Sequence, residues 1–418
     1  LDENGQSANG TNPNEGTTYV AFAVDFNGTQ SRATEEGTDD EVDSDGNGIS
    51  SAYVIMADAE GNFSKVLSMN EDAVTSGEGY NTTAKKYLFQ TEPGTYTFYA
   101  VINPDEVPAA GGTVSDYFDT PVQFVGGSAG AYTLNIATAD NFMLANQTAE
   151  PVAVKDNITE QQALEGGTAE TNSFTINVER VSAKVTVTAA DDAVPGDAGG
   201  TISGTTFNLR GGAMKSFRMT QGSTAEAEGN SWDYEVLNTN VLVSSDANAY
   251  RKASPVYCLE NLHTTYVQDE TTYITIKTAF IPSKVVNASG EVVDNTETTA
   301  KTFYVVSTGD LAGNYILADA DGSAPELPNG VTAVSGPYTD GVCWFGPIWF
   351  GQEIPNESAT APVNRNTWYN LNITNIELPG SPKEPKPIED EELEPATNVA
   401  ITLSILPWKF KNIGVNLQ

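Results

Sequence analysis

Histidine and cysteine are scarce in this chain: its 418 residues include one histidine, His263, and two cysteines, Cys258 and Cys343. A Ser-His-Asp triad, a Cys-His dyad and a histidine-rich metal site all need residues that this composition supplies poorly. We therefore expect neither an enzyme nor a cofactor. The cysteine spacing fits no zinc or redox motif, which leaves one disulfide or two buried small side chains. We favour the second alternative.

Basic residues are also few, with 20 Lys+Arg against 56 Asp+Glu and a net charge of −36. Such a chain repels nucleic acid and anionic membranes, so neither is expected as a partner. The 39% of hydrophobic residues is nevertheless enough for folded domains. The acidic excess therefore indicates a solvated, soluble surface, and no carboxylate pair stands out as that of a hydrolase.

Long apolar runs are absent and helix signals are weak. No stretch of about 18 apolar residues is present, which argues against a membrane-spanning helix. Only residues 156–164 favour a short helical turn. Elsewhere, short alternating segments are separated by Gly, Pro and Asn turns, and the chain is long enough for two domains. We predict an all-β fold of two tandem β-sandwich domains.

Each expected strand shows apolar residues at alternate positions. In the first domain the strands are expected at residues 52–57, 86–89, 95–102, 121–124 and 142–145. In the second they are expected at residues 206–209, 215–219, 232–237, 256–259, 273–281, 301–306, 342–350 and 368–376. The longest interior run, 173–188, changes parity at Glu179 and Arg180, which predicts a bulge or a change of sheet. The predicted domains are 33–172 and 173–378.

The first expected strand, residues 18–26, carries Val20, Phe22, Val24 and Phe26 on one face and Tyr19 on the other. Its alternation is typical of a strand with one buried face. Because it precedes a long polar loop, we treat residues 1–32 as a leader that includes one removable strand. Its removal from a sandwich would leave an apolar groove and unpaired strand edges.

The polar loop behind this strand contains Arg32, followed by Ala33; Arg32 is the only basic residue before Lys65. It is either an ordinary surface arginine or a trypsin-like processing site, since cleavage concentrates in exposed loops of small residues. The same loop carries Asp43, Asp45 and Asn47, spaced like the start of a calcium loop. Val54 stands where that loop needs glutamate, so we favour an acidic turn over a metal site.

Residues 379–398 form an acidic, proline-rich linker that predicts an extended tether. Beyond it, the tail 399–418 alternates again, and Pro407 divides it in two because proline cannot donate to a ladder. The tail residues expected to act as a donor strand are Val399, Ile401, Leu403, Ile405, Leu406, Pro407, Trp408, Phe410, Ile413, Val415 and Leu417.

Two fates of the tail remain open. It could fold back as a hairpin on its own second domain, or it could enter the groove of a neighbouring chain by strand addition. The second fate joins different surfaces and produces an open filament. In an uncut chain we expect the tail to be loosely attached or disordered. The aromatic residues Trp344, Phe345, Trp349 and Phe350 could form an exposed sugar- or partner-binding patch, but we favour buried core.

Several segments together resemble a known family. They are 31–33, 178–180, 183–185, 364–366, 369–376, Leu406-Pro-Trp-Lys409 and 415–417. In these segments the sequence resembles the major subunits of Bacteroidales type V fimbriae, in particular the fimbrillin of the short (minor, Mfa-type) fimbria. The Leu-Pro-Trp-Lys ending behind a proline-rich linker is the most specific of these features.

The resemblance implies two transthyretin-like β-sandwiches and an outer-membrane lipoprotein precursor that becomes part of a cell-surface fimbrium (pilus). It implies that an arginine-specific or trypsin-like protease cuts after Arg32. The freed groove then accepts the C-terminal strands of the next subunit by donor-strand exchange. The implied partners are further copies of the chain, accessory tip and anchor subunits, and host or bacterial surface ligands in adhesion, colonisation and virulence.

The alternative is an accessory or tip adhesin of the same fimbria that binds a surface ligand. A tip subunit needs a groove but no donor strand, whereas a stalk subunit needs both.

Overall fold

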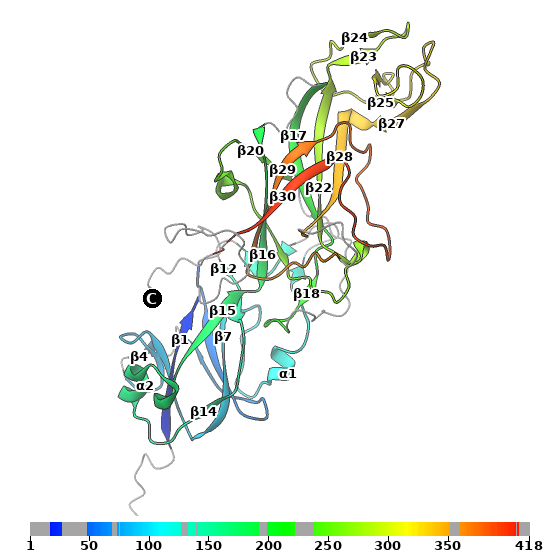
Figure 1. Ribbon diagram of the computed structural model, residues 1–418. Coiled ribbons are helices and arrows are strands. Elements are labelled where there is room, and N and C mark those ends of the chain that lie inside the picture. The colour runs from blue at the N-terminus through cyan, green and yellow to red at the C-terminus, as the bar shows by residue number, and fades with distance from the viewer. Residues whose placement is uncertain are drawn as a thin grey trace, which may run out of the picture.

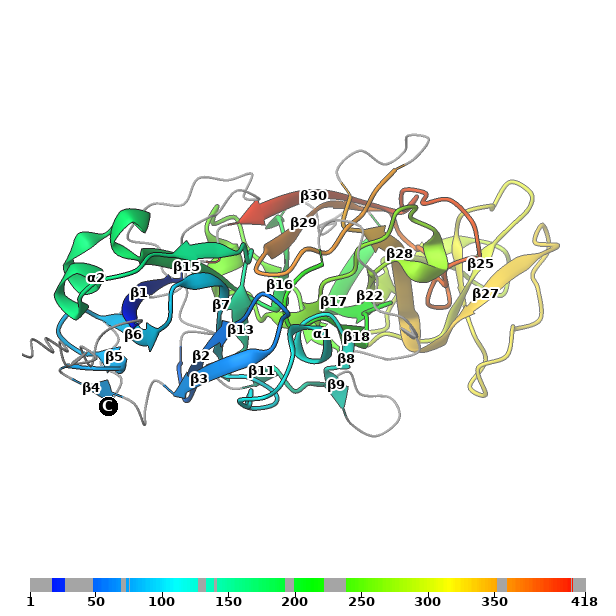
Figure 2. The same cartoon turned by 90° about the horizontal axis from the view of Figure 1, so that it is seen from below.

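The computed structural model describes residues 17–26, 48–68, 73–74, 76–126, 133–138, 141–191, 199–221, 238–351, 359–406 and Trp408. The molecule is elongated, with an N-terminal half and a C-terminal half joined end to end (Figures 1 and 2). Nearly all regular elements are strands, which confirms the predicted all-β fold of two β-sandwiches.

The described helices are short. Helix α2 (Glu160–Gly166) overlaps the predicted helical turn; Thr159 and Gln162 form a capping box at its start, and Gly167 ends it with φ 70°. Helix α1 (Val114–Tyr117), capped by Thr113, was not predicted because one turn is too short to show periodicity. Single 3-10 turns lie at Ala169–Thr171, Ala249–Lys252, Gln268–Glu270 and Thr339–Gly341. No helix in the described ranges is long and apolar enough to cross a membrane.

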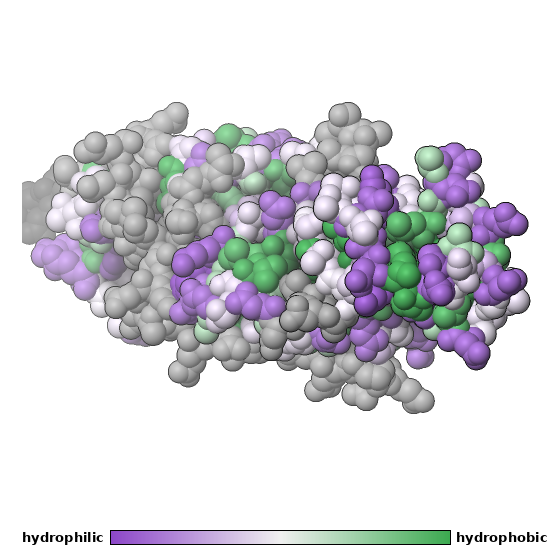
Figure 3. All heavy atoms as spheres, turned by 90° about the horizontal axis from the view of Figure 1, so that it is seen from above, coloured by the Kyte–Doolittle hydropathy of each residue, from purple (hydrophilic) through white to green (hydrophobic). Residues whose placement is uncertain are grey.

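Large exposed apolar side chains are few among the residues that the structure describes. Figure 3 shows hydrophobic residues as separate patches among hydrophilic ones on the face that it presents. Within the described ranges, the exposed large hydrophobic residues are Val107, Val243, Val292 and Ile388. They lie far apart in the sequence, and single exposed apolar residues are normal for a folded domain.

The N-terminal half is built on one large sheet of ten strands, in the order β3-β2-β7-β13-β15-β1-β6-β5-β4 with β14 added to β7. Its strands are β1 (Thr18–Asp25), β2 (Ala52–Ala57), β3 (Phe63–Ser68), β4 (Ala73–Val74), β5 (Gly79–Asn81), β6 (Lys86–Thr91), β7 (Gly94–Ile102), β13 (Leu144–Asn146), β14 (Val152–Val154) and β15 (Ser173–Arg180). The sheet curls around its core, because the rings of Phe22 on β1 and Phe98 on β7 lie 5.3 Å apart although their strands are not neighbours.

Shorter strand pairs lie between the two large parts, and one of them joins the two halves. Strand β8 (Val122–Gln123) pairs with β18 (Lys215–Ser216), which follows much later in the chain. Strands β9 (Val125–Gly126) and β10 (Thr133–Leu134) form one local pair, and β11 (Ala137–Thr138) and β12 (Asn141–Phe142) form another.

The chain changes sheets where the parity of its alternation changes. Strand β15 ends at Arg180 in the N-terminal sheet, and β16 (Ser182–Ala189) begins a sheet of the C-terminal half. Val181 between them is fully buried. The predicted change of sheet is thus confirmed, and it falls at Val181, beyond the domain boundary at residue 173 that the sequence suggested.

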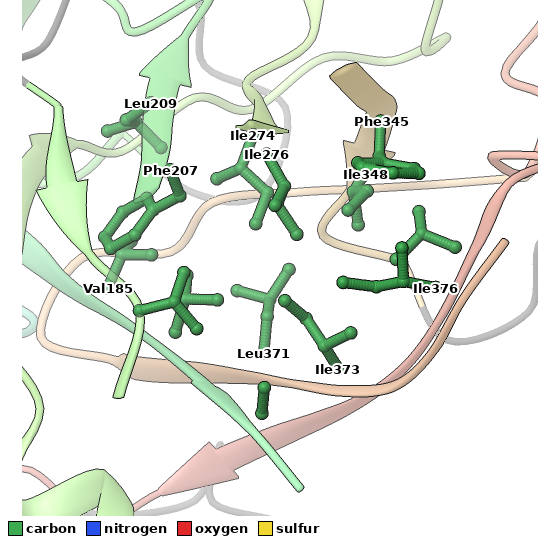
Figure 4. Close-up of a cluster of buried hydrophobic side chains, with 14 of the residues drawn as sticks. Val185, Phe207, Leu209, Ile274, Ile276, Phe345, Ile348, Leu371, Ile373 and Ile376 are labelled. Carbon is green, nitrogen blue, oxygen red and sulfur yellow. The ribbon is translucent and has the colours of Figure 1, made fainter. Parts of the chain in front are cut away.

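The C-terminal half is a sandwich of two sheets, β20-β16-β29-β30 with β21 added to β16, and β19-β17-β22-β28. The strands are β17 (Gly200–Arg210), β19 (Thr239–Asn240), β20 (Leu242–Val243), β21 (Val256–Leu259), β22 (Tyr273–Pro282), β28 (Val342–Trp349), β29 (Trp368–Ile376) and β30 (Val399–Leu406). Figure 4 shows side chains of the two sheets pointing toward one another, among them Val185, Ile276 and Leu371.

Smaller sheets extend the far end of this half. They comprise β23 (Lys284–Val286), β24 (Val292–Asp294), β25 (Phe303–Val306), β26 (Tyr315–Leu317) and β27 (Val334–Tyr338). The bounds predicted for β2, β21 and β29 agree with the structure. The strand predicted at 232–237 lies outside the described residues.

Candidate functional site

Strand β1 is an interior strand of the N-terminal sheet. It runs antiparallel to β6, from Thr18 opposite Thr91 to Phe22 opposite Tyr87. It runs parallel to β15, from Ala21 opposite Ser173 to Asp25 opposite Asn177. Because both edges of β1 are paired, its removal would leave two strands with unpaired backbone groups.

The side chains of β1 are covered on both faces. Val20 and Phe22 are fully buried and Phe26 is nearly so, as the sequence predicted, and Val24 is half-buried. The Phe22 ring lies 5.5 Å from that of Tyr87 and 5.6 Å from that of Phe89.

The opposite face of β1 meets helix α2. Ala21 is fully buried with Ala163 of that helix, and Tyr19 packs beside them. The sequence predicted only one buried face for β1. The other face carries small residues, and these did not indicate that a helix covers it.

A polar clamp holds the beginning of β1, and sequence reasoning missed it. The Thr18 hydroxyl donates to the Lys155 carbonyl oxygen at 2.7 Å and accepts from the Ile158 N–H at 3.0 Å. The Asn172 side-chain amide donates to the Tyr19 carbonyl oxygen at 3.0 Å. Asn172 has φ 52°, a conformation that asparagine tolerates better than most residues. The only sequence signal was an Asn just before a strand.

Arg32 and Ala33, the predicted processing site, lie outside the described residues, as do Asp43, Asp45 and Asn47 of the weak calcium candidate. These assignments stay predictions. Among the residues that the structure describes, no group of three or more His, Cys, Asp or Glu side chains could hold a metal ion.

The first part of the tail is an edge strand of the C-terminal sandwich. β30 pairs antiparallel with β29, from Leu406 opposite Trp368 to Val399 opposite Ile376, with one register shift between Ile373 and Asn375. The expectation of a loosely attached tail is therefore wrong for residues 399–406. The open edge of β29 satisfies the backbone of β30, so this part of the tail folds back on its own domain.

The apolar face of β30 meets the core, as its alternation predicted. Val399 and Leu403 are buried, and Ile401 and Ile405 are partly buried, against the C-terminal core. Leu406 lies on the other face of the strand and is buried in the cluster of Phe142, Trp368 and Trp408. Thr402 is exposed. The predicted donor residues Pro407, Phe410, Ile413, Val415 and Leu417 lie outside the described residues.

Trp408 lies at the junction of the two halves with no exposed surface. Its ring lies 5.6 Å from that of Phe142, edge to face, and 5.9 Å from that of Tyr257, stacked. The Arg180 guanidinium lies 4.1 Å from the centre of the Trp408 ring and donates to the Trp408 carbonyl oxygen at 2.8 Å. Trp408 is thus held by residues from both halves.

The proline-rich linker follows the surface of the C-terminal half. Two backbone hydrogen bonds, each 2.9 Å long, attach it to the domain. The backbone N–H of Trp344 donates to the Ser381 carbonyl oxygen, and the backbone N–H of Gln268 donates to the Glu391 carbonyl oxygen. Arg210 forms a two-pronged ion pair with Glu384 at 2.8 and 3.0 Å. The segment that composition predicted as a tether is tied to the domain by these contacts.

The remaining candidates belong to the core. Cys258 and Cys343 are free and buried, and burial raises the pKa of both thiols to about 12. The preferred interpretation as buried small side chains is therefore confirmed. Of the predicted aromatic cluster, Phe345, Trp349 and Phe350 are buried, whereas Trp344 is half-buried with the Lys277 ammonium 5.4 Å from its ring centre.

One family model matches the C-terminal strands of this chain. Residues 337–412, which include β28, β29 and β30, match the family described as "Major fimbrial subunit protein type IV, Fimbrillin, C-terminal". No curated protein matches the chain.

Solved structures resemble the whole chain. A candidate cell adhesion protein from Parabacteroides distasonis is 13% identical, with a TM-score of 0.50, over 95% of this chain and 98% of the other. A fimbrilin (FimA) from Porphyromonas gingivalis W83 is 14% identical, with a TM-score of 0.48, over 94% and 98% of the two chains. The tip fimbrial protein Mfa3 from Porphyromonas gingivalis, with a C-terminal truncation, is 13% identical, with a TM-score of 0.42, over 94% and 100%.

At such identities, the likeness to the Parabacteroides distasonis protein concerns the fold alone. The family match covers β28 to β30, which include the first part of the predicted donor strand. The chain as a whole shares its all-β fold with the Parabacteroides distasonis protein.

Proposed function

We propose that this protein is a structural subunit of a cell-surface fimbrium that polymerises head to tail. Cleavage between Arg32 and Ala33 frees β1, and residues 399–417 of the next subunit take its place. The fimbrillin match at residues 337–412 supports a fimbrial role. In this role the precursor is an outer-membrane lipoprotein, and the filament supports adhesion and colonisation. Its partners are further copies of the chain and accessory tip and anchor subunits.

One observation carries the proposal: β1, the first described strand, is an interior strand of its sheet and precedes Arg32 in the sequence. Only β1 precedes Arg32 among the described strands, and both its edges and both its faces are engaged. Three large buried side chains, Val20, Phe22 and Phe26, would leave the core with it. Their burial is worth on the order of 5–9 kcal/mol, an upper bound for the drive to refill the groove.

The tail has the chemistry to refill that groove. Strand β30 presents alternate apolar side chains on one face, as β1 does, and it occupies a sheet edge that only β29 holds. It can therefore leave without disturbing an interior strand. The donor face also favours a stalk subunit over the alternative of a tip adhesin, which needs no donor strand.

Limited trypsin treatment followed by electrophoresis in detergent without heating tests the proposal. We expect a ladder of multimers from the wild-type chain. We expect none from Arg32→Ala or from a chain that ends at residue 396. Lys252→Ala, which removes a largely exposed basic side chain elsewhere, is the matched control and should still give the ladder. A monomer from the cut wild-type chain would rule out polymerisation.

A further inference from the structure

The contacts of Trp408 define a binding site at the junction, which we call the Trp408 seat: Phe142, Arg180 and Tyr257. Phe142 lies on β12 and Arg180 ends β15, both in the N-terminal half, whereas Tyr257 lies on β21 in the C-terminal half. The arrowhead of β30 points toward the N-terminal half in Figure 2. Two residues after β30, Trp408 therefore enters a buried site whose walls belong to three different sheets, two in the N-terminal half and one in the C-terminal half.

The seat recognises an indole by several contacts together. An edge-to-face ring, a stacked ring and a guanidinium surround Trp408, and each contact is favourable for a fully buried ring. The hydrogen bond from Arg180 to the Trp408 carbonyl oxygen is charge-assisted and fixes the backbone as well as the ring. Lys184 adds a second positive charge, 5.9 Å from the ring centre.

One feature of the seat opposes binding. The indole Nε1 of Trp408 is buried and has no hydrogen-bond partner among the residues that the structure describes. A buried donor that loses its water partner destabilises the bound state, so the occupied seat is less stable than its ring contacts alone would make it. These opposing contributions suit a site that holds its occupant but can release it.

We propose that the Trp408 seat is an intramolecular binding site for an aromatic side chain, which retains the C-terminal strand on its own subunit until assembly. β30 is paired along one edge only, with β29. Trp408 is the last residue of the chain that the structure describes, and its contacts add to those that hold the C-terminal end of β30. The strand must leave the seat before it can act as a donor. This role in assembly rests on the proposed function, whereas retention of the strand does not.

Hydrogen exchange on the uncut full-length chain tests retention. In Trp408→Ala we expect the backbone amides of residues 401–406 to exchange about tenfold faster or more, because the end of β30 then frays freely. The amides of β22, in the facing sheet, should keep their protection. Trp344→Ala, which removes a tryptophan outside the seat, is the matched control and should leave β30 unchanged.

Phe142→Leu provides a milder second variant that changes a wall of the seat and leaves Trp408 in place. It should also speed exchange in β30, by a smaller factor. If Trp408→Ala loses protection in β22 and is therefore unfolded, this milder variant decides whether the seat retains β30. Exchange in β30 that equals the wild type in a folded variant would overturn the seat as a retaining site.

The assembly role is tested separately by cleaving Phe142→Leu and timing the ladder of multimers. Because the donor sequence is unchanged, we expect faster ladder formation than in the wild type. An equal or slower rate would overturn the assembly role of the seat. If the cut wild type forms no ladder, the proposed function fails, and hydrogen exchange still decides retention.

Discussion

Phe22 is the residue on which the removable strand depends most. It is fully buried and its ring contacts those of Tyr87, Phe89 and Phe98 from two other strands. A smaller side chain there leaves a cavity that the curled sheet cannot close completely.

We therefore expect Phe22→Ala to lower the free energy of unfolding of the N-terminal half by about 3–5 kcal/mol. Urea denaturation monitored by far-UV circular dichroism, which reports on the backbone, measures the change. Val107→Ala truncates a hydrophobic side chain that is 57% exposed and should change stability by less than about 0.5 kcal/mol. Equal effects of the two substitutions would contradict the burial of β1.

The two cysteines predict a loss of stability in alkali. Burial raises the pKa of Cys258 and Cys343 from 9.0 to about 12, so the folded state binds these protons more tightly than the unfolded state. Their contribution to stability is complete below pH 9 and is lost as the pH rises toward 12. We expect a lower urea midpoint at about pH 10.5 than at pH 8, and a smaller decrease in the double variant Cys258→Ala/Cys343→Ala. An identical decrease in the double variant would show that other groups cause it.

At the scale of elements, β30 distinguishes its two faces clearly. Leu403 faces the core and is 9% exposed, whereas its neighbour Thr402 faces away and is exposed. A charge can be tolerated on the second face but not in an apolar groove.

We predict that Leu403→Asp abolishes the ladder of multimers after cleavage, because a buried carboxylate prevents the strand from filling the groove. Thr402→Asp places the same charge one residue away and should leave the ladder intact. Electrophoresis without heating compares the two variants. Loss of the ladder in both would indicate that charge alone, and not the buried face, impairs assembly.

At the scale of the whole molecule, Arg218 connects the two halves. Its guanidinium forms two 2.8 Å hydrogen bonds with Asp105 and lies 4.0 Å from the centre of the Tyr117 ring in the N-terminal half. Its carbonyl oxygen accepts a hydrogen bond from Arg365, a fully buried residue that also pairs with Glu260. Removing one partner of such a buried network leaves an uncompensated charge.

Arg218→Ala should therefore lower the free energy of unfolding by on the order of 3 kcal/mol and separate the thermal unfolding of the two halves. Scanning calorimetry measures both effects. Lys284→Ala removes an exposed ion pair with Asp294 and should leave the free energy of unfolding nearly unchanged, because solvent screens such a pair. A single unchanged transition in Arg218→Ala would contradict its role at the junction.

Local patterns foretold the strands well. Alternation located β2, β21 and β29, the buried face of β1 and the parity change at which the chain enters a new sheet. The period of two follows directly from the pleat, so each of these features can be recognised within a few residues.

The tail that was predicted as a donor strand shows where local patterns stop. Alternation identified β30 as a strand with one apolar face, yet it did not reveal that β29 offers this strand an edge. The clamp of Thr18 and Asn172 leaves only an Asn before a strand as a short-range signal, and the Trp408 seat leaves none, because their partners lie far away in the sequence. Backbone pairing and side-chain recognition depend on which surfaces meet in three dimensions, so the clamp and the β29–β30 pairing arise only when each half has folded, and the Trp408 seat only when the two halves meet.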